Sequence, residues 1–142
     1  MGGFVADAGV HLAHTVRRLL GMPTVVANLT AQFDPKLVPL DTAVAVLRFA
    51  SGALGTWTSC FSVHQHRGPM LRIYGGKGTA ELTMKTATLR SAKGNETLFS
   101  SDVDSFYLQF SHFHDVVRKA VPVRCGPADA LQDLMLIESL VA

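Results

Sequence analysis

The middle of the chain carries six successive short segments with the residue pattern of β-strands, and the patterns on either side of them are helical. The six segments are residues 24–33, 42–49, 54–63, 70–74, 79–84 and 87–91. Strands that follow one another through short connections pair antiparallel, because parallel strands need long crossovers. The helical segments are residues 7–20, 106–120 and 128–141. This order predicts an α+β fold, with an open, mainly antiparallel sheet of about six strands and helices on one face.

Glycine and proline residues support these boundaries. Gly21 and Pro23 end the first helix, and Pro127 favours the start of the last one. Ser51 and Gly52 provide the turn of a hairpin between two of the strands.

Two aromatic features are expected to pack in the interior. Trp57 lies in the middle of a predicted strand, where it packs on the sheet or at a dimer face. The helix at 106–120 carries an apolar stripe, which we expect in the core. The stripe consists of Phe106, Phe110, Phe113 and Val117.

The composition excludes several classes of protein. Apolar residues make up 48% of the 142 residues, which is enough for the core of one domain and excludes disorder by composition. Charged residues make up only 17%, below the roughly 25% of an average globular chain. We therefore expect the helix-free face of the sheet to meet a second subunit or domain, most simply in a homo-oligomer. A net charge of +2 without a basic stripe argues against nucleic acid as a partner.

The cysteines and the N-terminal segment bear on the compartment. Cys60 and Cys125 are far apart and form no C-x-x-C pattern, so we expect free thiols in a reducing cytosol. Arg17 and Arg18 follow the first apolar run, whereas a signal peptide has its basic residues first. No apolar run approaches the ~18 residues that span a bilayer. These observations predict a cytoplasmic protein without a membrane partner.

The spacing of Asp7 and His11 is the feature most suggestive of chemistry. Residues four apart on a helix project from the same face. Oxidation of a secondary alcohol requires a base for the hydroxyl proton, and a histidine can accept a proton at neutral pH. A carboxylate beside it can orient the imidazole or hold a neighbouring substrate hydroxyl. The structural alternative is that Asp7 lies near a helix start, as a cap or as a partner of the helix dipole.

Four stretches, in this order, resemble the C-terminal domain of the glucose-fructose oxidoreductase / inositol dehydrogenase / rhizopine-catabolism (Gfo/Idh/MocA) family. They are Gly2-Gly3 with Asp7-x-Gly9-x-His11, then residues 45–56, residues 71–79, and the tail from Ala130-Leu131-Gln132-Asp133 onward. The likeness covers essentially the whole chain. It implies a fold like the C-terminal domain of glyceraldehyde-3-phosphate dehydrogenase, with residues 1–142 as a single domain for substrate binding and oligomerisation.

The resemblance also implies roles for three residues. His11 would be the catalytic acid/base, and Asp7 its partner in orienting the substrate. Gly9 would let the substrate or cofactor approach the helix closely. All three would thus contribute to substrate binding. The cofactor implied by the family is NAD or NADP.

The sequence departs from the family pattern in one large respect. Neither the Gly-x-Gly-x-x-Gly loop of an N-terminal Rossmann domain nor the family's Glu-Lys-Pro segment occurs in it. The glycines of residues 75–78 lie between two predicted strands, so they are not a phosphate-binding turn at a helix N-terminus. We therefore expect a fragment, a truncated reading frame or a degenerate paralogue, whose cofactor is bound mainly by a Rossmann domain missing from this chain.

A metal site has weaker support. His14 is three residues from His11, and together with Asp7 they offer ligand types, but no further ligand pattern completes a site. We therefore predict no metal, and a partly exposed position for His14.

Two functions from different classes remain. The first is the substrate-binding domain of an NAD(P)-dependent oxidoreductase of a sugar, polyol or related secondary alcohol, inactive as an isolated chain. The alternative is a non-catalytic dimerisation or scaffold module derived from that family. A hydrolase or metal protein built on the histidines is a third reading with little support. Whether the chain belongs to an active enzyme depends on the cofactor-binding domain.

Overall fold

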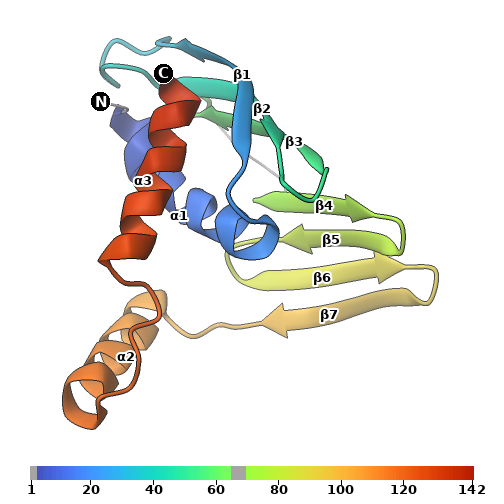
Figure 1. Ribbon diagram of the computed structural model, residues 1–142, viewed down its shortest axis with the longest axis vertical. Helices are drawn as coiled ribbons and strands as arrows, with labels where there is room; N and C mark the ends of the chain where they lie inside the picture. The colour runs from blue at the N-terminus through green and yellow to red at the C-terminus, as the bar shows by residue number, and fades with distance from the viewer. Residues whose placement is uncertain (1–2, 65–69) are drawn as a thin grey trace. The chain divides into compact units, whose positions relative to one another are not determined.

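The computed structural model describes residues 3–64 and 70–142 (Figure 1). Along the chain the elements are α1 (Gly3–Leu20), β1 (Thr24–Ala31), β2 (Thr42–Arg48), β3 (Leu54–Cys60), β4 (Leu71–Gly75), β5 (Gly78–Leu82), β6 (Thr86–Ser91), β7 (Gly94–Ser100), α2 (Ser105–Lys119) and α3 (Pro127–Val141). The α+β class and the antiparallel pairing of the strands are confirmed. The chain divides into two compact units, residues 1–65 with 125–142 and residues 66–124, which are described separately.

The first unit consists of an antiparallel sheet, β1-β2-β3, and the helices α1 and α3. The two helices pack on each other, while α3 also contacts β1 and β2, and α1 contacts β3 (Figure 1). Along β2, side chains alternate between buried and exposed, as expected for a strand with helices on one face. The core of this unit joins α1, the inward side of β2, β3 and α3, through Val5, Ala13, Val16, Ala43, Ala45, Leu47, Trp57, Leu136, Ile137 and Leu140.

Helix α1 begins four residues earlier than the predicted start at residue 7. It runs from Gly3 and has no acidic residue in its first turn. Asp7 is therefore the fifth residue of the helix, and the interpretation of Asp7 as a cap is wrong. The helix ends at Leu20, where Gly21 adopts the left-handed φ of +84° and donates its N–H to the carbonyl of Arg17. Gly2, which belongs to the first stretch of family resemblance, lies outside the described residues.

The second unit contains a four-stranded antiparallel meander, β4-β5-β6-β7, and helix α2. The described strands thus number seven, in sheets of three and four, where the sequence predicted about six in one sheet. Strand β7 was not predicted, because its sequence GNETLFS is mostly polar and every one of its residues is exposed. Without a buried side a strand has no alternation for a sequence pattern to detect.

Helix α2 forms where the periodicity predicted it, but its apolar stripe is exposed. Asp104 caps its first turn by accepting hydrogen bonds from the amides of Phe106 and Tyr107. The stripe residues Phe106, Phe110, Phe113 and Val117 are between 64% and 67% exposed, so their prediction as core is wrong for the described chain. Periodicity specifies that one face of a helix is apolar; it carries no information about the surface that covers this face. Among the described residues, no helix is long and apolar enough to span a bilayer.

Candidate functional site

Asp7 and His11 lie one turn apart on the same face of α1, and both are exposed. The described contacts include no hydrogen bond or ion pair of either side chain. The backbone carbonyl of His11 accepts a hydrogen bond of 3.0 Å from the hydroxyl of Thr15. Because both side chains are exposed, a small molecule can approach them on this face of the helix.

Gly9 faces the opposite way, into the contact between α1 and α3. It is buried, and a Cβ atom at this position would lie 2.8 Å from Cδ1 of Ile137 and 3.7 Å from the ring of Trp57. The close approach that glycine permits is thus made by α3 of the same chain. The structure gives Gly9 a packing role that holds α1 tightly on α3.

A chain of charged side chains joins α1 to α3 beside this packing contact. The Nδ1 atom of His14 lies 2.9 Å from Oδ2 of Asp133, and Nε of Arg17 lies 3.1 Å from Oδ1 of the same carboxylate. Among the described residues, neither Arg17 Nε nor Asp133 Oδ1 has a hydrogen-bond partner, so their contact is an ion pair without hydrogen-bond geometry. Arg17 Nη2 also donates to the carbonyl of Asp129, at 3.2 Å. Arg17 and Asp133 are both buried, whereas His14 is partly exposed as predicted.

Sequence reasoning missed the role of Asp133. The residues that Asp133 meets are more than a hundred positions away in the sequence, so no local motif connects them. One signal was available: Arg17 and Asp133 each fall on the side of a helix that otherwise carries apolar residues. Buried charges of opposite sign are expected to pair.

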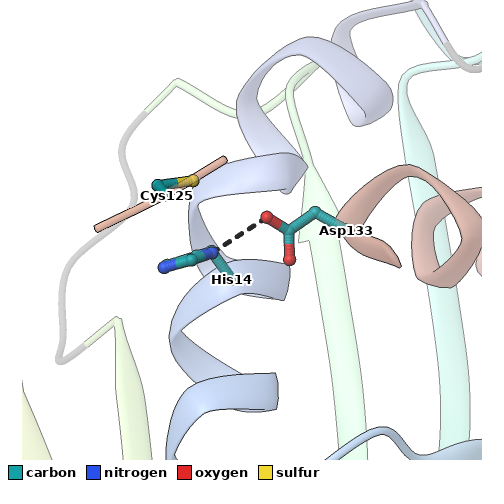
Figure 2. Close-up of side chains that lie close together, drawn as sticks. All are labelled: His14, Cys125 and Asp133. Carbon is teal, nitrogen blue, oxygen red and sulfur yellow. Dashed lines mark hydrogen bonds and ion pairs between the residues drawn. The ribbon is translucent and has the colours of Figure 1, made fainter. Parts of the chain in front are cut away.

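Cys125 lies just before α3 and close to this cluster. Ligand atoms of His14, Cys125 and Asp133 all lie within 4.8 Å of one another (Figure 2). From the sequence, Asp7, His11 and His14 were candidate metal ligands, and no metal site was predicted. The three residues that the fold brings together come from both ends of the chain.

A second polar cluster surrounds Asp41 at the start of β2. The carboxylate is fully buried; its Oδ2 accepts from the amides of Phe33 and Asp34 at 2.8 and 2.7 Å, and its Oδ1 accepts from the hydroxyls of Thr42 and Ser62. Burial alone would raise the pKa of Asp41, but these hydrogen bonds, led by the Asp34 amide, outweigh burial and lower it.

The Cys60 thiol borders the same cluster. Hydrogen bonds with the hydroxyls of Ser62 and Thr42 lower the pKa of Cys60. These contacts tie the start of β2 to the end of β3, where Thr42 and Cys60 are direct cross-strand partners. The cluster therefore joins the start of β2 to the end of β3, and the Asp41 carboxylate accepts hydrogen bonds from four protein donors.

Two open hollows of the described surface lie away from these residues. One open hollow lies between β1 and α3 and is lined by Met22, Pro23, Thr24, Val25, Val26, Ala27, Asn28, Met135, Ser139 and Ala142. Another lies along α2. Neither of these two hollows is lined by Asp7 or His11, which lie on an exposed face of α1.

Comparison with known protein families shows to which family the chain belongs. The model described as "Oxidoreductase family, C-terminal alpha/beta domain", of the Gfo/Idh/MocA group, matches residues 1–142. The chain belongs to this family. The resemblance seen in the four sequence stretches is thereby confirmed.

Individual relatives of this Gfo/Idh/MocA domain are distant in sequence and close in fold. Dehydrogenase FPY6 of Fusarium mangiferae is 26% identical over 152 residues, which cover 99% of this chain and 43% of that protein. The crystal structure of an oxidoreductase from Thermotoga maritima superposes with a TM-score of 0.83 at 28% identity, covering 99% of this chain and 42% of that one. The WlbA dehydrogenase of Bordetella pertussis, solved in complex with NADH and UDP-GlcNAcA, gives a TM-score of 0.66 at 19% identity, again covering 99% and 42%. The chain thus spans less than half the length of each of these proteins.

Proposed function

We propose that this Gfo/Idh/MocA domain forms the substrate side of an NAD(P)-dependent oxidoreductase that acts on a sugar, a polyol or a related secondary alcohol. The observation that carries the proposal is the pair Asp7 and His11, exposed on one face of α1. The rest of this helix is held rigidly by the Gly9–Ile137 and Arg17–Asp133 contacts. A site on a rigid helix keeps its two groups in a fixed relation, which acid/base chemistry requires.

The proposed chemistry assigns one task to each residue. A nitrogen of the His11 imidazole takes the hydroxyl proton of the substrate as the carbinol carbon loses hydride and becomes a carbonyl. Asp7 accepts a hydrogen bond from a neighbouring hydroxyl and so positions the ring of the sugar or polyol. Oxidation of the carbon needs a hydride acceptor, which NAD or NADP provides when bound. In the reverse direction protonated His11 returns the proton to the alkoxide oxygen.

The cofactor is proposed to be bound by a separate Rossmann domain. In this chain the glycine-rich residues 75–78 form the tight turn between β4 and β5, with Gly75 opposite Gly78 in the strand register. A phosphate-binding glycine loop instead leads into a helix N-terminus. The WlbA dehydrogenase, whose C-terminal fold this chain shares, is a longer protein and was solved with NADH bound.

The alternative function is a dimerisation or scaffold module without chemistry. It is favoured by the apolar side chains on the face of the first sheet that the helices do not cover. Leu29, Val44 and Val46 are 79%, 42% and 44% exposed there. The two functions are distinguished by asking whether His11 affects turnover.

The test supplies the chain with a Rossmann domain, either from its own gene or from the Thermotoga maritima relative, and follows NAD(P)H formation with a panel of polyols and sugars. His11→Asn should lower kcat by about 10²- to 10⁴-fold, which is the usual contribution of a general base. His114→Asn, at an exposed position of α2, is the matched control and should leave kcat unchanged. Turnover that is equal in both variants removes His11 from the mechanism. Oligomerisation without turnover by any variant favours the scaffold function.

A further inference from the structure

The carboxylate of Asp133 presents its two oxygens to two different kinds of partner. Oδ1 lies 3.1 Å from Nε of Arg17, deep in the contact between α1 and α3. Oδ2 lies 2.9 Å from Nδ1 of His14, which is 31% exposed. Oδ1 is thus paired with a buried cation, while Oδ2 faces the imidazole of His14 (Figure 2).

The thiol of Cys125 completes this arrangement. Cys125 is exposed, and its sulfur lies within 4.8 Å of the ligand atoms of His14 and Asp133. A thiolate, an imidazole and a carboxylate are the three side-chain types that bind Zn²⁺. Mg²⁺ and Ca²⁺ prefer all-oxygen sites, so the presence of sulfur and nitrogen selects zinc or a similar transition metal.

We propose that His14, Cys125 and Asp133 form a Zn²⁺ site, with Nδ1, Sγ and Oδ2 as protein ligands and a water molecule in the fourth position. With zinc–ligand bonds of about 2.0 to 2.3 Å, tetrahedral ligands lie roughly 3.3 to 3.7 Å apart. To reach these separations, His14 Nδ1 and Asp133 Oδ2 have to move slightly apart from their 2.9 Å distance. The Cys125 sulfur lies within 4.8 Å of both ligand atoms and has to move toward them by about 1 Å. Cys125 can make this move because it is exposed and lies before the first turn of α3.

The charges around the site are consistent with this binding. Zinc binding displaces the proton of the Cys125 thiol to solvent, and the hydrogen that His14 Nδ1 donates to Asp133 has to move to Nε2, or to solvent if the ring is protonated. Sγ, Nδ1 and Oδ2 then each offer a lone pair to the ion, and no oxidation state changes. The Asp133 carboxylate keeps its Arg17 partner through Oδ1, as the oriented carboxylates of metal sites keep outer partners. The opposite side of the site is open to water through Cys125, which gives the ion a path of entry.

The consequence is a clamp between the two ends of the chain. His14 lies on α1 and Asp133 on α3, 119 positions apart, so the ion would join the helix that carries His11 to the last helix. The ion would hold α1 in position through His14, which is three residues from His11. It would not be part of the proposed acid/base pair of His11 and Asp7. This inference does not depend on the proposed oxidoreductase function.

Cobalt substitution gives a direct test on the purified, metal-free protein. One equivalent of Co²⁺ should produce a thiolate-to-cobalt charge-transfer band in the near ultraviolet and the strong visible bands of tetrahedral cobalt, and Zn²⁺ should abolish both. Cys125→Ser should remove the charge-transfer band and weaken Zn²⁺ binding by at least about tenfold. His14→Gln keeps a donor for Asp133 and should weaken Zn²⁺ binding by a similar factor.

Cys60→Ser is the matched control, because Cys60 is the other cysteine of the chain and its thiol is hydrogen-bonded to the hydroxyls of Ser62 and Thr42. This variant should bind cobalt and zinc as the unmodified protein does. Zn²⁺ should also raise the thermal midpoint of the unmodified protein and of Cys60→Ser, but not that of Cys125→Ser. The proposal is overturned if the unmodified protein gives no charge-transfer band with one equivalent of cobalt, or if the band survives Cys125→Ser.

Discussion

A Cβ atom on Gly9 would lie 2.8 Å from Cδ1 of Ile137, so a larger residue at position 9 requires the end of the Ile137 side chain to shift. Gly9→Ala gains helix propensity, worth about 1 kcal/mol, but it forces the Ile137 side chain or the helices to move. Overpacking costs about 1–3 kcal/mol, so we expect a net loss of up to about 2 kcal/mol in the free energy of unfolding. Urea unfolding followed by far-ultraviolet circular dichroism measures this loss.

Shortening the partner side chain should relieve the clash. Gly9→Ala combined with Ile137→Val, which removes the Cδ1 atom, should be more stable than the sum of the two single changes predicts. Gly76→Ala is the control, because a Cβ there meets no atom within 4 Å. Strictly additive effects at positions 9 and 137 would show that the contact does not limit the packing of α1 on α3.

The buried carboxylate of Asp133 should be costly to remove. Asp133→Leu leaves the charge of Arg17 buried without its partner, and we expect a loss of about 3–5 kcal/mol in the free energy of unfolding. Replacing both groups, with Arg17→Met and Asp133→Leu, should recover most of this loss, because an apolar pair avoids the desolvation of two charges. The exposed Asp7→Asn variant is the control and should change stability by no more than about 0.5 kcal/mol. A double variant no more stable than Asp133→Leu would contradict the pairing.

Asp41 should make the stability of the protein fall at acidic pH. The hydrogen bonds to its carboxylate lower its pKa in the folded state below the ordinary value of 3.8. The folded protein therefore binds a proton at this site less readily than the unfolded chain does. The stabilisation is complete above pH ~4 and is lost as the pH falls through the folded-state pKa, below the ordinary value.

The measurement is the thermal midpoint from pH 7 down into acid. Asp41→Asn keeps an oxygen for the two amides and an amide group for the two hydroxyls, so the variant should fold, with a midpoint several degrees lower at neutral pH. Its midpoint should fall less steeply in acid than that of the unmodified protein. Asp102→Asn, whose side chain is 96% exposed, should leave the acid slope unchanged. Equal slopes in the Asp41→Asn variant and the unmodified protein would remove Asp41 from the acid response.

The sequence predicted the elements that have two distinct sides. Strand β2 was found because its buried and exposed positions alternate, and α3 was found because Pro127 and the apolar spacing agree. Strand β7 and the division into two sheets were not found, since β7 is exposed along its whole length. The apolar stripe on α2 predicted the helix correctly, but the prediction that the stripe is buried was wrong. An apolar helix face does not identify the surface that covers it.

The candidate site also has a part that the sequence predicted and a part that it did not. The shared face of Asp7 and His11 follows from their spacing on a helix and needs no tertiary information. The packing of Gly9 on Ile137 and the cluster of His14, Cys125 and Asp133 depend on how α1 and α3 meet. Contacts between residues more than a hundred positions apart leave no local pattern in a single sequence. The buried charges on both helices were the one available sign of such a contact.

The uncovered face of the first sheet should mediate association between copies of the chain. Val44 lies between its register partners Leu29 and Thr58, and directly paired residues project from the same face of a sheet. These side chains point away from α1 and α3, and Leu29 is 79% exposed. A contiguous apolar face of this kind is typical of a subunit interface. Val44→Lys should therefore shift the protein from oligomer to monomer in sedimentation velocity without a change in its circular dichroism.

The matched control places the same charge on an exposed strand of the other unit. Thr97→Lys lies on the exposed strand β7, opposite Thr88 in the strand register, and should leave the oligomeric state unchanged. A second change on the proposed interface, Leu29→Lys, should act in the same direction as Val44→Lys, because both residues lie on the same face. If the unmodified protein sediments as a monomer at every concentration tested, or if Val44→Lys remains an oligomer, the face has another role and the scaffold function loses its structural support.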